Sequence, residues 1–205
     1  MTSMRLSLAC LTAATVLLSA GCGGGSPKAA DQGPTPSPYR GMTVVGSSKA
    51  PDFALHDQAG RLVRMSSRQG GFTLVTFLYT NCPDVCPLIA EHLNTALRRL
   101  GQARRDTRVL AVSVDPKGDT PAAVRRFVAV HHLLPQFRYL SGSAAQLKAV
   151  WAAYHVASDP QHGTTAVGHS AFVLLVDRQG VERLVYDAYV KPGDIVHDIN
   201  ALKEK

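Results

Sequence analysis

The chain of 205 residues carries 22 Lys and Arg against 15 Asp and Glu, which gives a net charge of +7. That length allows one ordinary domain with tails and excludes a large multidomain protein. The basic residues are scattered in short pairs such as Arg98-Arg99, typical of solvated helix faces, and no nucleic-acid partner is expected.

The first 21 residues have the pattern of an export signal. Arg5 gives a weakly positive start, and the apolar run from Leu6 to Ala20 is closed by small residues. Cys22 follows Ala-Gly directly, as in a bacterial lipobox, where the signal is removed and the cysteine receives lipid. Ser19 stands where a lipobox usually has a large aliphatic residue. Plain secretion and an uncleaved N-terminal anchor are the alternatives.

Lipidation at Cys22 implies a location on the extracytoplasmic face of a bacterial cell membrane. Nucleic acid is absent there, while anionic lipid headgroups are a weak electrostatic partner. Removing residues 1–21 takes away one Arg and leaves 21 basic against 15 acidic residues, or +6. Cys10 leaves with the signal, so the folded domain keeps only Cys82 and Cys86.

Residues 22–48 are expected to form a tether. They are rich in Gly, Ser, Pro and Ala, and they contain almost no large apolar residue before Val44. A tether of this kind lets a surface-bound domain reach a neighbour in the same membrane. The folded domain is therefore expected over residues 49–205.

Short apolar runs separated by turn signals fill the domain. Phe53-Ala54-Leu55 and Leu62-Val63 predict a hairpin, and the continuous apolar run Phe72–Tyr79 predicts a central strand buried on both faces. Helical spacing of apolar residues predicts a helix over Pro87–Leu100, which Gly101 ends. The later expected elements are a strand over 109–114, a helix from 121 to about 131, a strand over 137–140, a helix over 143–154, a hairpin of 171–176 with 181–189, and a closing helix over 192–203. This order predicts an α/β fold with a thioredoxin-like central sheet flanked by helices and an N-terminal hairpin.

The two remaining cysteines lie between the central strand and the helix that follows it, in Cys82-Pro83-Asp84-Val85-Cys86. Backbone N–H groups at a helix start lower thiol pKa values. A close pair of this kind can be a disulfide, a redox couple or a soft-metal site. Three intervening residues can open the pair for one metal ion, and thiolates select Cu(I) over hard cations. A third ligand is then expected from elsewhere in the chain.

His169 is the candidate for that ligand among eight histidines. It stands in Gly168-His169-Ser170, directly before the apolar run Ala171–Val176. In a thioredoxin-type sheet the loop before that strand faces the cysteine pair, and thioredoxins have a cis-proline there. A histidine before a strand is by itself more often a packing residue, but the cysteine pair reverses that balance.

These residues make the chain similar to the SCO/SenC family from about Pro51 to Leu202. The similarity is carried by Pro51-Asp52-Phe53, by the stretch from Thr80 to Pro87, by Ser113-Val114-Asp115-Pro116 with Asp119-Thr120-Pro121, and by Gly168-His169-Ser170-Ala171-Phe172. The resemblance implies a thioredoxin-like protein that binds copper, as Cu(I) or Cu(II), through Cys82, Cys86 and His169. It further implies service to the copper-bearing subunit of cytochrome c oxidase, in assembly of the binuclear copper centre.

The chain keeps some of the acidic positions of the family and lacks another. Gly168 departs from the family, in which many members have Asp before the His. Asp115 and Asp119 match the family's acidic positions. We expect Asp119 to cap the following helix. We expect Asp115 to contact the metal ligands without binding the metal itself.

Two functions fit the cysteine pair, and a third does not. A non-enzymatic copper chaperone is the favoured interpretation. A thiol–disulfide reductase that keeps the acceptor cysteines reduced is the alternative, and both roles can coexist. A peroxiredoxin-like peroxidase is disfavoured because Tyr79 stands where such sites have Thr.

Overall fold

The computed structural model describes residues 37–46, 48–67, 70–156 and 171–204. The expected signal over 1–21, Cys22 and His169 lie outside these ranges. In the described part of the chain, no helix combines the length and apolar character that a membrane crossing requires.

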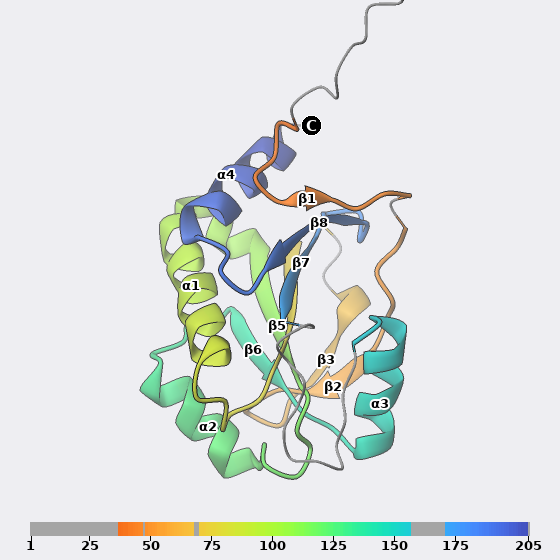
Figure 1. The fold of residues 1–205 in the computed structure, drawn as a ribbon, viewed down its shortest axis with the longest axis vertical. Coiled ribbons are helices and arrows are strands. Elements are labelled where there is room, and N and C mark those ends of the chain that lie inside the picture. Colours follow the sequence, from red (N-terminus) through yellow and green to blue (C-terminus); the bar gives the residue numbers. More distant parts are fainter. Residues whose placement is uncertain (1–36, 47, 68–69, 157–170, 205) are drawn as a thin grey trace, which may run out of the picture. The chain divides into compact units, whose positions relative to one another are not determined.

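The described strands form one six-stranded sheet and a separate hairpin (Figure 1). The order in the sheet is β1-β8-β7-β4-β5-β6, in which β4, β5 and β6 run parallel and β7, β8 and β1 pair antiparallel. The strands are β1 (Met42–Thr43), β2 (Ala54–His56), β3 (Leu62–Arg64), β4 (Phe72–Leu78), β5 (Thr107–Ser113), β6 (Phe137–Leu140), β7 (Phe172–Val176) and β8 (Glu182–Asp187). The predicted α/β architecture is confirmed.

Helices cover both faces of the sheet (Figure 1). On one face lie α1 (Val85–Arg99), α2 (Pro121–Val130) and α4 (Pro192–Lys203), and on the other lie α3 (Ala144–Ala153) and the β2–β3 hairpin. Alternate residues of β4 enter the two cores. Leu74 and Leu78 pack with the α1 side, whereas Val75 and Phe77 pack with the α3 side. Every residue of β4 is buried, which explains its run of apolar and β-branched residues without a charged side chain.

Helix α1 starts two residues earlier than predicted, at Val85 rather than Pro87. Pro87 occupies the third position of the helix, where its missing N–H costs nothing because first-turn N–H groups have no helical partner. Cys86 therefore lies within the first turn. Gly101 ends the helix with a positive φ of 56°, as predicted.

Three short elements were not predicted: strand β1 and the 3-10 helices η1 (Met65–Ser67) and η2 (Gly101–Asp106). The backbone before β1 is held by the buried carboxylate of Asp198 on α4, which accepts hydrogen bonds from the N–H groups of Arg40 and Gly41 at 2.9 and 2.8 Å. A Cβ on Gly41 would lie 2.7 Å from the ring of Tyr186, so only glycine fits. The end of the expected tether is thus fixed to the domain.

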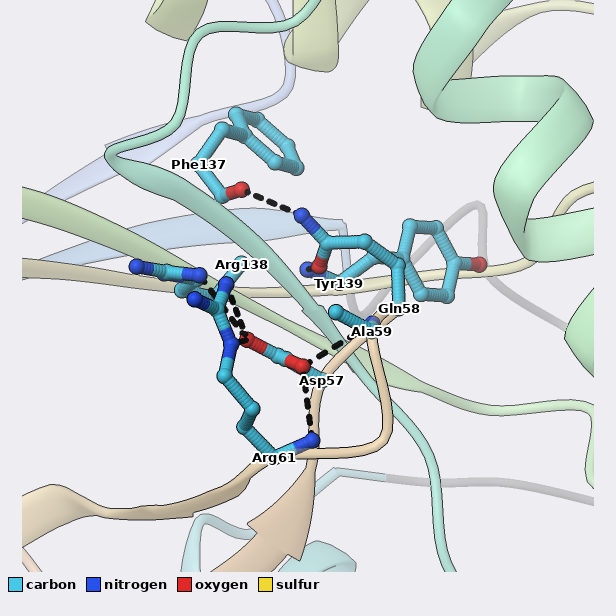
Figure 2. Close-up of polar contacts among 7 residues, drawn as sticks. All are labelled: Asp57, Gln58, Ala59, Arg61, Phe137, Arg138 and Tyr139. Carbon is cyan, nitrogen blue, oxygen red and sulfur yellow. Dashed lines mark hydrogen bonds and ion pairs between the residues drawn. The ribbon is translucent and has the colours of Figure 1, made fainter.

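Strand β6 forms one edge of the sheet, and the hairpin covers it (Figure 2). The side-chain amide of Gln58 donates to the Phe137 carbonyl at 3.2 Å and accepts from the Tyr139 N–H at 3.0 Å. One side chain therefore takes the place of a neighbouring strand. This contact occupies backbone groups that would otherwise be open to strand pairing with another protein.

Candidate metal centre

The segment between β4 and α1, residues 79–84, is called the cysteine loop here. It carries Cys82 and leads into the first turn of α1, which carries Cys86. Cys82 is 9% exposed and Cys86 is fully buried, and both are free thiols. The backbone N–H of Cys86 donates to the Sγ of Cys82 at 3.3 Å. The start of α1 therefore directs a donor at the Cys82 sulfur, as expected for a thiol at a helix N-terminus.

The two thiols differ in acidity. Burial opposes ionisation of Cys82, but hydrogen bonds from the Cys86 thiol, the N–H groups of Asp84 and Cys86, and the Tyr79 hydroxyl outweigh it and lower its pKa. Burial, the neighbouring Cys82 and the Asp119 carboxylate together raise the pKa of Cys86 well above the ordinary range. The pair thus favours a Cys82 thiolate that accepts a hydrogen bond from a protonated Cys86. Binding of a metal ion to both sulfurs must release the Cys86 proton.

Asp119 holds the cysteine loop in place. Its buried carboxylate accepts hydrogen bonds from the Thr80 N–H at 2.7 Å, the Ser113 hydroxyl at 2.6 Å and the Tyr139 hydroxyl at 2.9 Å. Burial raises the pKa of Asp119, although these hydrogen bonds oppose the shift. The contacts join the start of the cysteine loop to the end of β5 and to β6.

The prediction that Asp119 caps α2 is wrong. The cap is Thr120, whose hydroxyl accepts from the Ala123 N–H at 3.2 Å. A capping side chain must face the open N–H groups of the first helical turn, whereas Asp119 faces into the protein toward Thr80. Sequence alone did not distinguish the two neighbours, because Asp and Thr are both favoured at this position.

Asp115 shapes the turn that follows β5. Its Oδ1 accepts from the Gly118 N–H at 2.9 Å and from the Lys117 N–H at 3.2 Å. A Cβ on Gly118 would lie 2.1 Å from the other Asp115 oxygen and 3.3 Å from the Asn81 amide nitrogen. The turn therefore packs tightly against the cysteine loop only because residue 118 is glycine. A role for Asp115 behind the metal ligands stays a prediction.

The described residues bring together the two predicted sulfur ligands, Cys82 and Cys86, but no predicted third ligand. Within them, no group of three or more His, Cys, Asp or Glu side chains is placed to hold a metal ion. His92, His131 and His197 contact the Val190 carbonyl, Glu91 and Asp198, respectively. The two thiols by themselves fit a soft ion that prefers sulfur.

Strand β7, which follows His169 in the chain, begins at the same end of the sheet as the cysteine loop. Val173 pairs with Thr76 near the end of β4, and the Thr76 hydroxyl donates to the Phe172 carbonyl at 2.8 Å. The chain therefore enters the described sheet beside the strand that leads to Cys82.

Sequence reasoning missed the supporting network of this site. Tyr139 falls in the predicted strand over 137–140 and Tyr79 ends the predicted central strand, but neither was predicted to hydrogen-bond within the site. Burial raises the pKa of Tyr139 far above its usual range, and the nearby Asp119 carboxylate adds to the shift, so Tyr139 remains a hydrogen-bond donor. The one available signal was a polar tip within an apolar run, which is not specific.

Comparison with known proteins places these features in context. The family model described as SCO1/SenC matches residues 43–204. The chain is 31% identical over 134 residues to an SCO2-like protein of Rickettsia conorii, a match that covers 63% of this chain. The same match spans 64% of the Rickettsia protein, slightly less than two thirds of its length.

Solved structures show the same fold. The structure of Bradyrhizobium japonicum ScoI with copper bound has a TM-score of 0.65 and 30% identity, and the match covers 76% of this chain and 99% of that one. BsSco, described as a member of the Sco family of cytochrome c oxidase assembly proteins with a disulfide switch, has a TM-score of 0.67. Its identity is 22%, with 80% of this chain and 98% of that chain covered, so it supports the fold alone.

Proposed function

The chain belongs to the SCO1/SenC family, and from that membership we propose that it is a membrane-tethered copper chaperone for assembly of the binuclear copper centre of cytochrome c oxidase. Proteins of the family are linked to copper binding and to oxidase assembly. The observation that carries the proposal is the free thiol pair at the start of α1, with Cys82 receiving a backbone N–H.

The proposed ligands are Cys82, Cys86 and His169. Two sulfurs with one imidazole suit Cu(I), and the imidazole also makes the site acceptable to Cu(II). The position of β7 beside the end of β4 supports His169, because that strand starts three residues after it. Copper is the cargo, so each ligand must be able to pass it to the copper-bearing subunit of the oxidase by stepwise exchange.

Anaerobic titration of the protein with Cu(I), followed by X-ray absorption, tests the ligand set. We expect one copper per chain with two sulfur neighbours and one imidazole nitrogen. Cu–S distances near those of thiolate ligands and the imidazole scattering pattern identify them. Fine structure that contains only oxygen and nitrogen neighbours would refute the proposal.

The proposed membrane attachment rests on lipidation of Cys22 beside a short tether. Fifteen residue steps (37 − 22) separate Cys22 from Ser37, the first described residue. At about 3.3–3.6 Å per residue, that segment spans at most roughly 54 Å. Ser37 would then remain within that distance of the membrane surface, and the backbone is held to the domain by Asp198 from Arg40 onward.

Cys22→Ala should release the protein from the membrane fraction into the soluble extracytoplasmic fraction. The reason is that the variant has no thiol to receive lipid at the end of the signal. Metabolic labelling with a fatty-acid analogue and cell fractionation measure the change, with Cys10→Ala as the matched control. Equal membrane retention of Cys22→Ala and the unaltered chain would favour an uncleaved N-terminal anchor.

The second candidate function is reduction of the acceptor's disulfide. The observation that favours it is the unequal acidity of the two thiols, since an accessible thiolate can attack a disulfide and a neighbouring thiol can resolve the mixed disulfide. The two functions make different demands on His169, which separates them experimentally.

A further inference from the structure

A cavity of about 440 Å³ lies at the end of the sheet opposite the cysteine loop. It is lined at the amino-terminal ends of β5 and β6, where Arg108 is the second residue of β5 and Gln136 immediately precedes β6. The cysteine loop, in contrast, follows the carboxyl end of β4, which runs parallel to both strands. The cavity is therefore separate from the proposed copper site, and its volume is in the range of small-ligand sites.

Among the described residues that line this cavity are four arginines and one carboxylate, that of Asp57. Arg61 comes from the turn between β2 and β3, Arg105 from η2, Arg108 from β5 and Arg138 from β6. The described lining residues thus carry four guanidinium groups and one carboxylate, an excess of positive charge. Such an excess attracts an anion.

Asp57 orients two of the arginines, Arg61 and Arg138 (Figure 2). Its Oδ1 accepts from the N–H groups of Ala59 and Arg61 at 2.9 and 3.0 Å. Its Oδ2 accepts from Arg61 Nε at 3.1 Å and from Arg138 Nη1 at 2.8 Å. The side chain of Asp57 is 1% exposed, whereas those of Arg138 and Arg61 are 27% and 62% exposed. Both guanidinium groups are thus pre-positioned with further N–H donors open to a ligand.

Arg108 has a different part in the cavity. Its guanidinium group donates to the Thr73 hydroxyl at 3.0 Å, to the Ser67 hydroxyl at 3.3 Å and to backbone carbonyls of residues 64 and 65. It therefore contributes charge and fixes the wall. Direct contact with a ligand falls to Arg61, Arg105 and Arg138.

Gln136 offers the complementary group. Its Oε1 atom is buried and has no hydrogen-bond partner in the described part of the chain, and its side chain lines the same cavity. A buried acceptor without a partner costs stability, so a turn of this side chain toward a hydroxyl or N–H donor on the ligand would be favourable.

We propose that this cavity binds a phosphate-bearing ligand through Arg61, Arg105 and Arg138. Guanidinium groups pair with phosphate oxygens in a bidentate manner. The three arginines belong to three separate elements, and a tetrahedral phosphate presents oxygens in several directions, whereas a planar carboxylate presents two in one plane. The phosphate can belong to a soluble phosphate compound or to the headgroup of an anionic lipid, whose glycerol hydroxyl would suit Gln136.

Isothermal titration calorimetry on the full chain in an uncharged detergent tests the proposal with two probes. Pyrophosphate represents a soluble phosphate compound, and glycerol 1-phosphate represents a lipid headgroup. Saturable binding of either probe at one site per chain supports the proposal. Tighter binding of glycerol 1-phosphate assigns the site to lipid, and tighter binding of pyrophosphate assigns it to a soluble ligand.

Arg138→Gln and Arg105→Gln should each raise the dissociation constant roughly tenfold, which corresponds to about 1.4 kcal/mol. Arg104→Gln is the matched control, because it removes the same charge from the same 3-10 helix but its side chain does not line the cavity. Circular dichroism shows whether each variant folds, and Arg105 is exposed, so its replacement leaves the Asp57 contacts intact.

Two results would overturn the proposal: no saturable binding of either probe, or equal weakening in Arg104→Gln and Arg105→Gln. Copper stoichiometry should be unchanged in all three variants, since the cysteine loop is at the other end of the sheet. The test is therefore independent of the proposed copper function.

Discussion

His169→Ala should abolish Cu(II) binding and oxidase maturation while leaving the dithiol able to react with a small disulfide. Without the imidazole, Cys82 and Cys86 still offer two sulfurs to Cu(I), so Cu(I) remains bound more weakly. Cu(II) requires the nitrogen ligand more strongly, because two thiolates alone suit the softer ion. A reductase needs only the two thiols, and for it His169 would adjust a thiol pKa by about one unit, or ~1.4 kcal/mol.

Oxidase activity in cells that carry the variant and copper stoichiometry of the purified chain are the two measurements. His162→Ala is the matched control, since it removes another imidazole from the same sequence stretch between α3 and β7. Normal oxidase assembly in a His169→Ala variant that has lost Cu(II) binding would make the metal site dispensable. The reductase function would then replace the chaperone function.

Cys82 should be the reactive thiol of the pair, and Cys86 should be nearly inert. We expect the thiol that remains in Cys86→Ser to react with iodoacetamide at least about tenfold faster at neutral pH than the thiol that remains in Cys82→Ser. Each unit of pKa changes the thiolate fraction about tenfold when the thiol is mostly protonated. Serine at position 86 can still donate a hydrogen bond to Cys82, and Cys86 stays fully buried in the other variant.

The alkylation rates of the two variants should depend on pH in different ways. Because the pKa of Cys82 is lowered, its thiolate is present above that lowered value and is lost as pH falls through it. The alkylation rate of Cys86→Ser should therefore rise with an inflection below the ordinary thiol range, whereas that of Cys82→Ser should still be rising at alkaline pH. Equal rates and equal inflections in the two variants would show that the start of α1 does not distinguish the sulfurs. Either variant should also lose tight copper binding, because only one of the two sulfurs is left to bind the ion.

The arrangement of elements was accessible from sequence because it depends on local periodicity and burial. The run from Phe72 to Tyr79 predicted a strand buried on both faces, and the structure confirms such a strand over Phe72–Leu78. The closing helix was predicted over 192–203 and has those bounds. The cysteine pair was placed at a helix start for the same reason, since a strand, a loop and a helix follow one another along the chain. Helix α1 begins two residues earlier than predicted, and several other bounds differ by one or two residues, such as β5 at Thr107–Ser113 against the predicted 109–114.

Contacts between distant polar residues were decided by the tertiary structure alone. Asp119 contacts Thr80 from 39 positions away, and no spacing rule separates such a contact from a helix cap. Arg105 is exposed and stands beside Arg104 in the sequence, and only the fold places it with Arg61 and Arg138 around one cavity. Strand β1 has two residues, and its pairing with β8 lies more than 140 positions ahead. Periodicity predicts which face of an element is buried, because burial follows the local spacing of apolar residues. The partner of a polar side chain is distant in the sequence, so it is decided only when the elements pack.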